Sequence, residues 1–232
     1  MPLYLTLELC SLFIPLIFSF DKKLKFYQYW RTLFLSIVIT GIFFIAVDIF
    51  FTRQGIWGFN LRYHSNIFIV SLPLEEWLFF VVIPYASIFI HYVFFCYYPG
   101  VFLNDRFTRI VTWIILTGTT LVILFNTDKT YTLVYSFILI GGLILSLFDK
   151  SQTINRFYVS FLIILIPFFI INAILTGSFI TDEVVWYNNS EITGVRIFTV
   201  PVEDIAYGFS LILLNLLLMS NFQKVFNRKH MK

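Results

Sequence analysis

The sequence predicts an all-α integral membrane protein of about seven transmembrane helices, arranged as a parallel internal repeat. Three observations lead to this prediction. The chain is 59% hydrophobic and only 12% charged, its basic residues gather on one side of the predicted spans, and its two halves match at one fixed shift. Soluble domains carry about 25% charged residues. A chain this apolar cannot cover a globule with polar surface, so lipid is its expected solvent.

Seven apolar runs are long enough, or nearly so, for a membrane-spanning helix of about 20 residues. No basic segment precedes the first run, so we expect a retained span rather than a signal peptide. The fourth and fifth runs are short, and six spans would remain if they formed a re-entrant pair. The runs lie at residues 3–20, 30–51, 73–98, 110–126, 131–148, 157–176 and 201–222.

The basic residues support seven spans and give an orientation. If the N-terminus lies outside, all but four of the 16 lysines and arginines fall on the cytoplasmic side; the exceptions are Arg53, Arg62, Lys129 and Arg196. This bias follows the positive-inside rule. It predicts a multi-pass protein of the cell membrane with its C-terminus in the cytoplasm. The net charge of +3 is small and scattered, so we expect no nucleic-acid partner.

An internal repeat appears when the sequence is shifted by 128 residues against itself. Charged, amide and proline positions match, which apolar helices alone would rarely produce by chance. Spans 1–3 therefore correspond to spans 5–7. The matches are Phe20-Asp21-Lys22 with Phe148-Asp149-Lys150, Asn60 with Asn188, Ile69 with Ile197, and Pro73-Leu74-Glu75-Glu76 with Pro201-Val202-Glu203-Asp204.

Span 4 gives both repeats the same direction across the membrane. Three spans reverse the side on which the chain emerges, and a fourth restores it, so both Pro-x-Glu-[Glu/Asp] motifs reach the outer face. We expect a first repeat at residues 1–105, a linking span at 106–130 and a second repeat at 131–232.

The four acids of these motifs are the candidate catalytic residues: Glu75, Glu76, Glu203 and Asp204. A proline followed by acids is also a good helix start, because proline suits the first helical position and the helix dipole favours carboxylates there. However, one acid would suffice as a cap, and here two adjacent acids recur at the edge of an apolar core, where ionisable groups are usually functional. A protonated carboxyl beside an ionised one is an acid–base pair.

Further polar and aromatic residues on the outer side are candidates for substrate contact. Two are acids within spans 1 and 2, and the others lie in the outer loops before the motifs. The alternative is that Asp48 is an interfacial polar residue and that the tryptophans belong to an aromatic belt. The candidates are Glu8, Asp48, Trp57, Asn60, Trp186, Asn188 and Arg196.

Nucleotide, zinc-hydrolase and serine-hydrolase signatures are missing from the sequence. There is no G-x-G-x-x-G, P-loop, H-E-x-x-H or G-x-S-x-G motif, and the three histidines are scattered. We therefore expect no cofactor and no metal.

Both motifs and their loops resemble the membrane-embedded carotenoid lycopene cyclases, in which two homologous three-span domains occur as a heterodimer or as one fused chain. The first domain is indicated by Asp48, Gly55-Ile56-Trp57-x-Phe59 and Leu72-Pro73-Leu74-Glu75-Glu76-x-x-Phe79-Phe80. The second is indicated by Val195-Arg196-Ile197-x-x-x-Pro201-x-Glu203-Asp204-x-x-Tyr207. Two departures are Asp204 in place of a second Glu, and Gly208 where the first motif has Phe80.

The resemblance implies an intramolecular lyase (isomerase) of the lycopene β-cyclase type, acting on a lipid-soluble acyclic carotenoid with membrane lipid as its other partner. It leaves association with other carotenoid-pathway enzymes open. Ring closure needs an acid, a base and exclusion of water, but no redox cofactor. We expect Glu75 and Glu203 to supply the acid, with Glu76 and Asp204 as base or tuning neighbours. The alternatives are a small proton- or cation-coupled transporter and a non-catalytic scaffold.

Overall fold

The computed structural model describes residues 1–230. Residues 231 and 232, which close the second predicted repeat and include one of the predicted cytoplasmic lysines, lie outside the described residues. The described chain is mainly helical, with short strands between helices. Its elements are α1 Leu3–Phe18, the 3₁₀ helix η1 Phe26–Tyr29, α2 Trp30–Gln54, β1 Trp57–Phe59, β2 Phe68–Ile69, β3 Leu72–Pro73, α3 Leu74–Tyr97, α4 Asp105–Phe125, α5 Thr130–Leu147, α6 Thr153–Leu175, β4 Val185–Tyr187, β5 Arg196–Ile197, β6 Val200–Pro201 and α7 Glu203–His230.

The helices have the length and composition of membrane spans. Six of those described are long and apolar enough to cross a bilayer, whereas α1 has only 16 residues, or about 24 Å. Large apolar side chains such as Phe13 and Trp113 point outward, 64% and 60% exposed, as lipid-facing residues do. The predicted all-α membrane fold is confirmed.

Two helices begin several residues earlier than the sequence predicts, and one predicted first helical residue is a cap instead. Helix α4 begins at Asp105 rather than at residue 110, because the Asn104 side chain caps it by accepting the Phe107 N–H at 2.8 Å. Helix α6 begins at Thr153 rather than at residue 157. Pro73 is the N-cap residue of α3 rather than its first helical residue.

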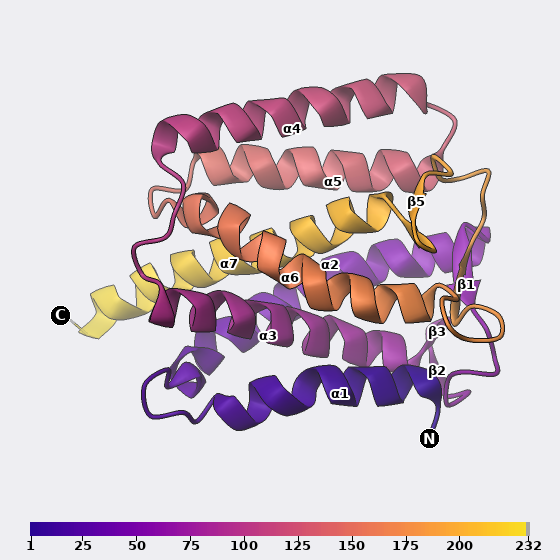
Figure 1. Ribbon diagram of the computed structural model, residues 1–232, viewed down its shortest axis with the longest axis horizontal. Coiled ribbons are helices and arrows are strands. Elements are labelled where there is room, and N and C mark those ends of the chain that lie inside the picture. Colours follow the sequence, from indigo (N-terminus) through magenta and orange to yellow (C-terminus); the bar gives the residue numbers. More distant parts are fainter. Residues whose placement is uncertain (231–232) are drawn as a thin grey trace.

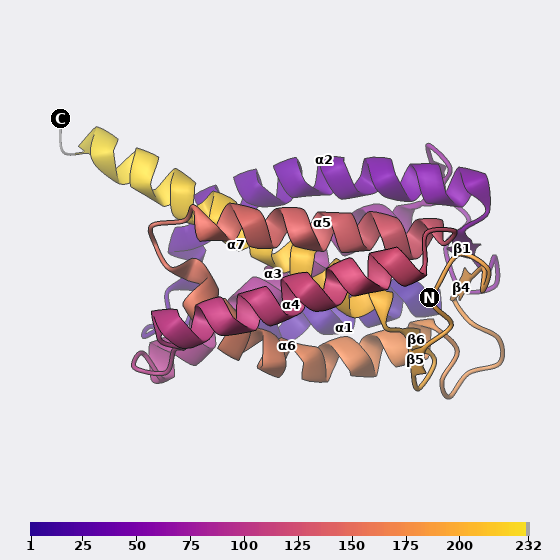
Figure 2. The same cartoon turned by 90° about the horizontal axis from the view of Figure 1, so that it is seen from above.

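The helices show the predicted repeat in space. In Figure 1 the odd-numbered helices run in one direction, and the N-terminus lies at the same end as the strands. Helix α1 packs on α3 as α5 packs on α7, and α2 packs on α7 as α6 packs on α3. Figure 2 shows the same bundle from above. The two halves are therefore related by an approximate two-fold axis along the bundle, and both motifs reach one end.

The loops at that end contain two equivalent hairpins, one in each half, and one strand pair that joins the halves. The hairpin β2–β3 pairs Phe68 with Pro73, and β5–β6 pairs Arg196 with Pro201 at equivalent positions. Strand β1 pairs antiparallel with β4 of the other half, placing Gly58 opposite Trp186. A Cβ on Gly58 would lie 2.6 Å from Trp186 Cζ2, so only glycine fits this close approach.

Candidate active site

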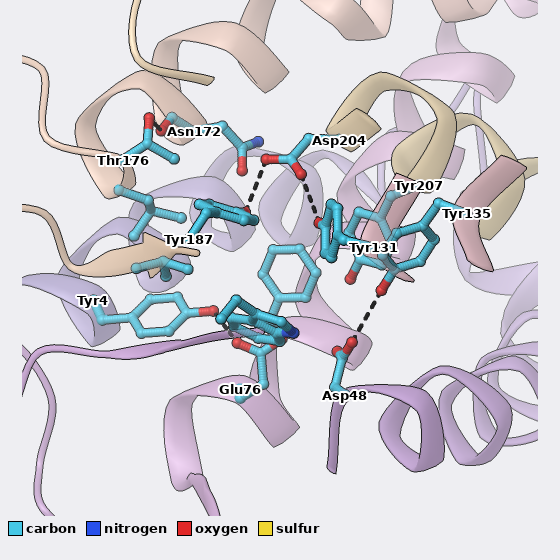
Figure 3. A pocket seen from close by; sticks show the side chains of 14 residues that line it. Tyr4, Asp48, Glu76, Tyr131, Tyr135, Asn172, Thr176, Tyr187, Asp204 and Tyr207 are labelled. Carbon is cyan, nitrogen blue, oxygen red and sulfur yellow. Dashed lines mark hydrogen bonds between the residues drawn. The ribbon is translucent and has the colours of Figure 1, made fainter. Parts of the chain in front are cut away.

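A small cavity lies beneath the β1–β4 pair, where the two halves meet. It has a volume of about 40 Å³, room for only about three water molecules. Three carboxyl groups from three helices line it, together with tyrosines and other aromatic residues (Figure 3). We call it the acid cavity, defined by Tyr4, Asp48, Trp57, Glu76, Phe79, Tyr131, Tyr135, Asn172, Leu175, Thr176, Val185, Tyr187, Asp204 and Tyr207.

The second acid of each motif faces this cavity. Glu76 on α3 is buried, and its Oε2 accepts the Tyr4 hydroxyl at 2.6 Å. Asp204, its counterpart on α7, accepts two phenolic hydroxyls, from Tyr131 to Oδ1 at 2.7 Å and from Tyr187 to Oδ2 at 2.9 Å. The Asp204 carboxyl is therefore bound by hydroxyl donors on both oxygens, whereas Glu76 accepts a hydroxyl on Oε2.

Asp48 on α2 supplies the third carboxyl. It is 1% exposed, and its Oδ1 accepts the Tyr135 hydroxyl at 3.0 Å. Three carboxyls around so small a space would repel one another strongly if all were ionised, since buried charges are poorly screened. The cavity therefore favours a mixture of protonated and ionised carboxyls, which is what proton transfer between an acid and a base requires.

The first acid of each motif lies outside the cavity lining. Glu75 accepts the Ser65 N–H at 2.6 Å and the Ser65 hydroxyl at 3.1 Å. Glu203 likewise accepts the Thr193 N–H at 2.6 Å, and also the Thr132 hydroxyl at 2.7 Å. Ser65 and Thr193 are repeat counterparts, so Glu75 and Glu203 bind the preceding loop to the helix start in both halves.

Among the other sequence candidates, Asp48 and Trp57 line the cavity. The Trp57 ring stacks on that of Tyr187, with centroids 6.4 Å apart. Glu8 is buried in α1 but does not line the cavity, and neither of its carboxyl oxygens has a hydrogen-bond partner among residues 1–230. Such a group is costly when ionised.

The remaining candidates stabilise the outer loops. Asn60 accepts the Arg62 N–H, and Asn188 accepts the Ser190 N–H and hydroxyl, so both asparagines shape turns. Trp186 covers Gly58 as described above. The Arg196 guanidinium donates to the Thr199 carbonyl and the Asn189 side chain. None of these four candidates lines the acid cavity.

Arg196 has an indirect relation to the site. Its guanidinium carbon lies 5.7 Å from the ring centroid of Tyr187, whose hydroxyl donates to Asp204. Burial raises the pKa of Tyr187 well above its usual value, and the charge of Asp204 adds to the effect. Tyr187 therefore stays protonated and remains a hydrogen-bond donor.

The hydroxyl donors were not among the candidates from sequence, although one signal was available. Tyr131 and Tyr135 are four residues apart in α5, so they share one helix face. Both donate to carboxyls of the cavity, those of Asp204 and Asp48. Tyr4 lies in α1 and belongs to a part of the chain remote from Glu76, so no local pattern connects the two.

Aromatic faces complete the lining. Tyr207 stacks with Phe79 at 6.2 Å between ring centroids and meets Tyr135 edge-on at 5.0 Å. Aromatic faces attract cations, most strongly where water is excluded. The site therefore combines proton donors, proton acceptors and cation-stabilising rings around one small space.

Comparisons with known proteins agree with this arrangement. A family model described as lycopene cyclase matches residues 1–95 and again residues 128–222, the two halves of the repeat. A bifunctional lycopene cyclase/phytoene synthase of Phycomyces blakesleeanus is 36% identical over 61 residues, which is 26% of this chain and 10% of that protein. The chain thus aligns with only a small part of that relative's length. No solved structure matches the chain.

Proposed function

Because the chain belongs to the lycopene cyclase family, we propose that it closes rings at the ends of lycopene, or of a similar acyclic carotenoid, by acid–base catalysis within the membrane. The reaction is an isomerisation of the β-cyclase type. One observation carries the proposal: Glu76, Asp48 and Asp204 meet on one small cavity lined by aromatic residues.

The reaction needs a proton at the start and releases one at the end. A carboxylic acid protonates the terminal C=C of the polyene, and a tertiary carbocation forms. The π electrons of a neighbouring double bond attack this cation, closing the ring and moving the positive charge onto it. A carboxylate then removes a proton from a ring carbon, and a C=C forms. The product has the same atoms as the substrate, and no electrons enter or leave.

The hydrogen bonds favour one assignment of the two roles. Two tyrosine hydroxyls donate to Asp204, and such donors stabilise a carboxylate, so we assign Asp204 as the base. Glu76 binds a hydroxyl through Oε2, which leaves Oε1 to present a proton toward the cavity, so we assign Glu76 as the acid. Asp48 lines the same cavity as a third carboxyl.

This assignment differs from the expectation from sequence, in which Glu75 and Glu203 supply the acid. Both bind the N–H of the preceding loop and lie outside the cavity lining. In the proposed mechanism they hold the loop and the helix start together, which fixes the direction in which Glu76 and Asp204 point.

After ring closure, the proton on Asp204 has to return to Glu76. The tyrosine hydroxyls bound to the carboxyls are groups that both donate and accept protons. They offer a route within the cavity for this transfer, and the few waters that fit there offer another. During the reaction the cavity must hold little water, because water would capture the cation.

The membrane arrangement follows from the same proposal. A carotenoid dissolves in the bilayer, so the enzyme is proposed to lie in the cell membrane with the N-terminus, both motifs and the acid cavity at the outer side. We also propose that residues 1–105 and 131–232 are two copies of one cyclase repeat, joined by the linking span 106–130. The basic residues on the opposite side support this orientation.

Expression in a bacterium that accumulates lycopene tests the function. We expect pigment chromatography to show products with end rings and the mass of lycopene, formed without an added cofactor. Unchanged lycopene, in cells whose membranes contain the protein, would contradict the proposal.

A further inference from the structure

A second, larger hollow adjoins the acid cavity on the lipid-facing side. It has a volume of about 360 Å³ and lies between α1, α3, α6 and α7. Ile14 and Ile170 on its wall are 60% and 59% exposed, so the hollow opens toward the surroundings of the bundle. We call it the apolar groove; its residues include Ile14, Ile83, Phe168, Ile170, Gly208 and Ile212.

The groove and the acid cavity share part of their walls. Phe79, Asn172 and Tyr207 line both. On α3 the groove extends from Phe79 to Ile90, about 16 Å along the helix axis. The inner end of the groove is therefore separated from the acid cavity only by these shared side chains.

The repeat relates this face to a second one, formed by α5, α7, α2 and α3, where large side chains fill the corresponding space. The repeat counterpart of Gly208 on the second face is Phe80, and the counterpart of Asn172 is Phe44. Both phenylalanines are buried, 2% and 0% exposed. The ring of Phe44 packs edge-on against Tyr207, with centroids 5.6 Å apart.

Prolines show the same asymmetry. Pro15, Pro84 and Pro167 lie inside α1, α3 and α6, three of the four helices that form the groove. The repeat counterparts of Pro15 and Pro167 on the other face are Leu143 and Ile39. The counterpart of Pro84 is Ile212, which itself lines the groove. A proline inside a helix removes a backbone hydrogen bond and bends the helix. Pro15 and Pro167 therefore remove helix backbone hydrogen bonds beside the groove, and the equivalent positions of the other face keep them.

We propose that the apolar groove binds the chain of an acyclic polyene, with the end of that chain at the wall that the groove shares with the acid cavity, and that Gly208 and Asn172 make this face the entrance. The inference rests on the proposed function and assigns its substrate path. Of the two repeat-related faces, the one with Phe44 and Phe80 is closed. Each binding event therefore brings one end of the carotenoid to the acids.

Lycopene retention by purified protein tests the groove apart from catalysis. The Glu76→Gln variant serves as the background, so that bound lycopene is not consumed. In this background Gly208→Phe fills the groove, since even a Cβ at position 208 would lie 3.1 Å from Phe168 Cε2. Ile170→Trp narrows the groove at its rim. The matched control is Ile42→Trp, because Ile42 is the repeat counterpart of Ile170 and is 67% exposed on the closed face.

We expect Gly208→Phe and Ile170→Trp to lower the lycopene that co-purifies per protein by about tenfold or more, the scale of an overpacking penalty. Ile42→Trp should retain as much as its background. If Gly208→Phe does not accumulate in the membrane, the comparison of Ile170→Trp with Ile42→Trp tests the proposed groove without it. Equal retention by Ile170→Trp and the background, or equal loss in Ile42→Trp, would overturn the proposal. A different result is that lycopene retention depends on the groove but the unmodified protein forms no rings. This result would contradict the proposed function and would still support polyene binding in the groove.

Discussion

Glu76 and Asp204 occupy the same place in the two repeats and line the same cavity, yet their hydrogen bonds differ. Glu76 accepts the Tyr4 hydroxyl, whereas Asp204 accepts the hydroxyls of Tyr131 and Tyr187. A repeat alone would give two equal carboxyls. In the proposed mechanism these unequal donors make one of two equivalent positions the acid and the other the base.

The first prediction concerns these two residues. Glu76→Gln and Asp204→Asn keep size and polarity but cannot transfer the proton. General acid–base groups contribute about 10²–10⁴-fold to rate, so each change should lower ring formation by that order while the protein still accumulates. Pigment chromatography at equal protein level measures the effect. Near-normal turnover by both variants would remove these carboxyls from the chemistry.

The second prediction separates the first acid of each motif from the second. Glu75→Gln and Glu203→Gln should weaken the bond to the Ser65 or Thr193 N–H at a cost on the order of 1 kcal/mol. We expect a lower thermal midpoint but most of the turnover in the protein that remains folded. A loss of turnover as large as that of Glu76→Gln, with an unchanged thermal midpoint, would return the acid role to these residues.

The third prediction concerns the donors to Asp204. Tyr131→Phe and Tyr187→Phe each remove one hydroxyl from the base and leave a ring of nearly the same shape. Each should lower turnover by about 10- to 100-fold, in line with the roughly 1.5–3 kcal/mol of a hydrogen bond to a charged group. Tyr158→Phe is the matched control, because Tyr158 bonds Thr112 and lies outside the acid cavity. Equal turnover in all three variants would argue against the assignment of the base.

The fourth prediction concerns the strand pair that joins the halves. Gly58→Ala should push Trp186 aside, because the new Cβ would lie 2.6 Å from its ring; overpacking of this kind costs about 1–3 kcal/mol. Gly100→Ala is the control, since nothing lies within 4 Å of a Cβ there. Thermal unfolding should show the difference. Equal midpoints for the two variants would mean that the close approach does not matter.

Most of the fold could be predicted from the sequence because its signals are local or strictly repeated. Hydropathy locates the spans, and the 128-residue shift matches Pro73 to Pro201 from the sequence alone. The strand pairing of Gly58 with Trp186 could not be predicted, because the two segments are short, lie far apart in sequence and have no alternating pattern.

The sequence predicts which motifs form the site, but it does not predict which acid of each motif faces the cavity. Adjacent residues on a helix point about 100° apart, given 3.6 residues per turn, so the Glu75-Glu76 pair alone cannot show which acid faces inward. That choice depends on the loop, where the Ser65 N–H binds Glu75. The tyrosines that bind the carboxyls come from other helices and from strand β4. The sequence contains 13 tyrosines, so their presence alone does not show which of them reach the site.

Transfer of a proton from an exchangeable acid to the polyene end is the central claim, and solvent deuterium tests it most directly. Protein equilibrated in deuterated water should convert lycopene in a single turnover to a product that contains one solvent deuterium for each ring formed, detected by mass spectrometry. Glu76→Gln should form little labelled product. Rings formed at the normal rate without deuterium, under conditions in which the buried carboxyls have exchanged, would contradict the proposed mechanism.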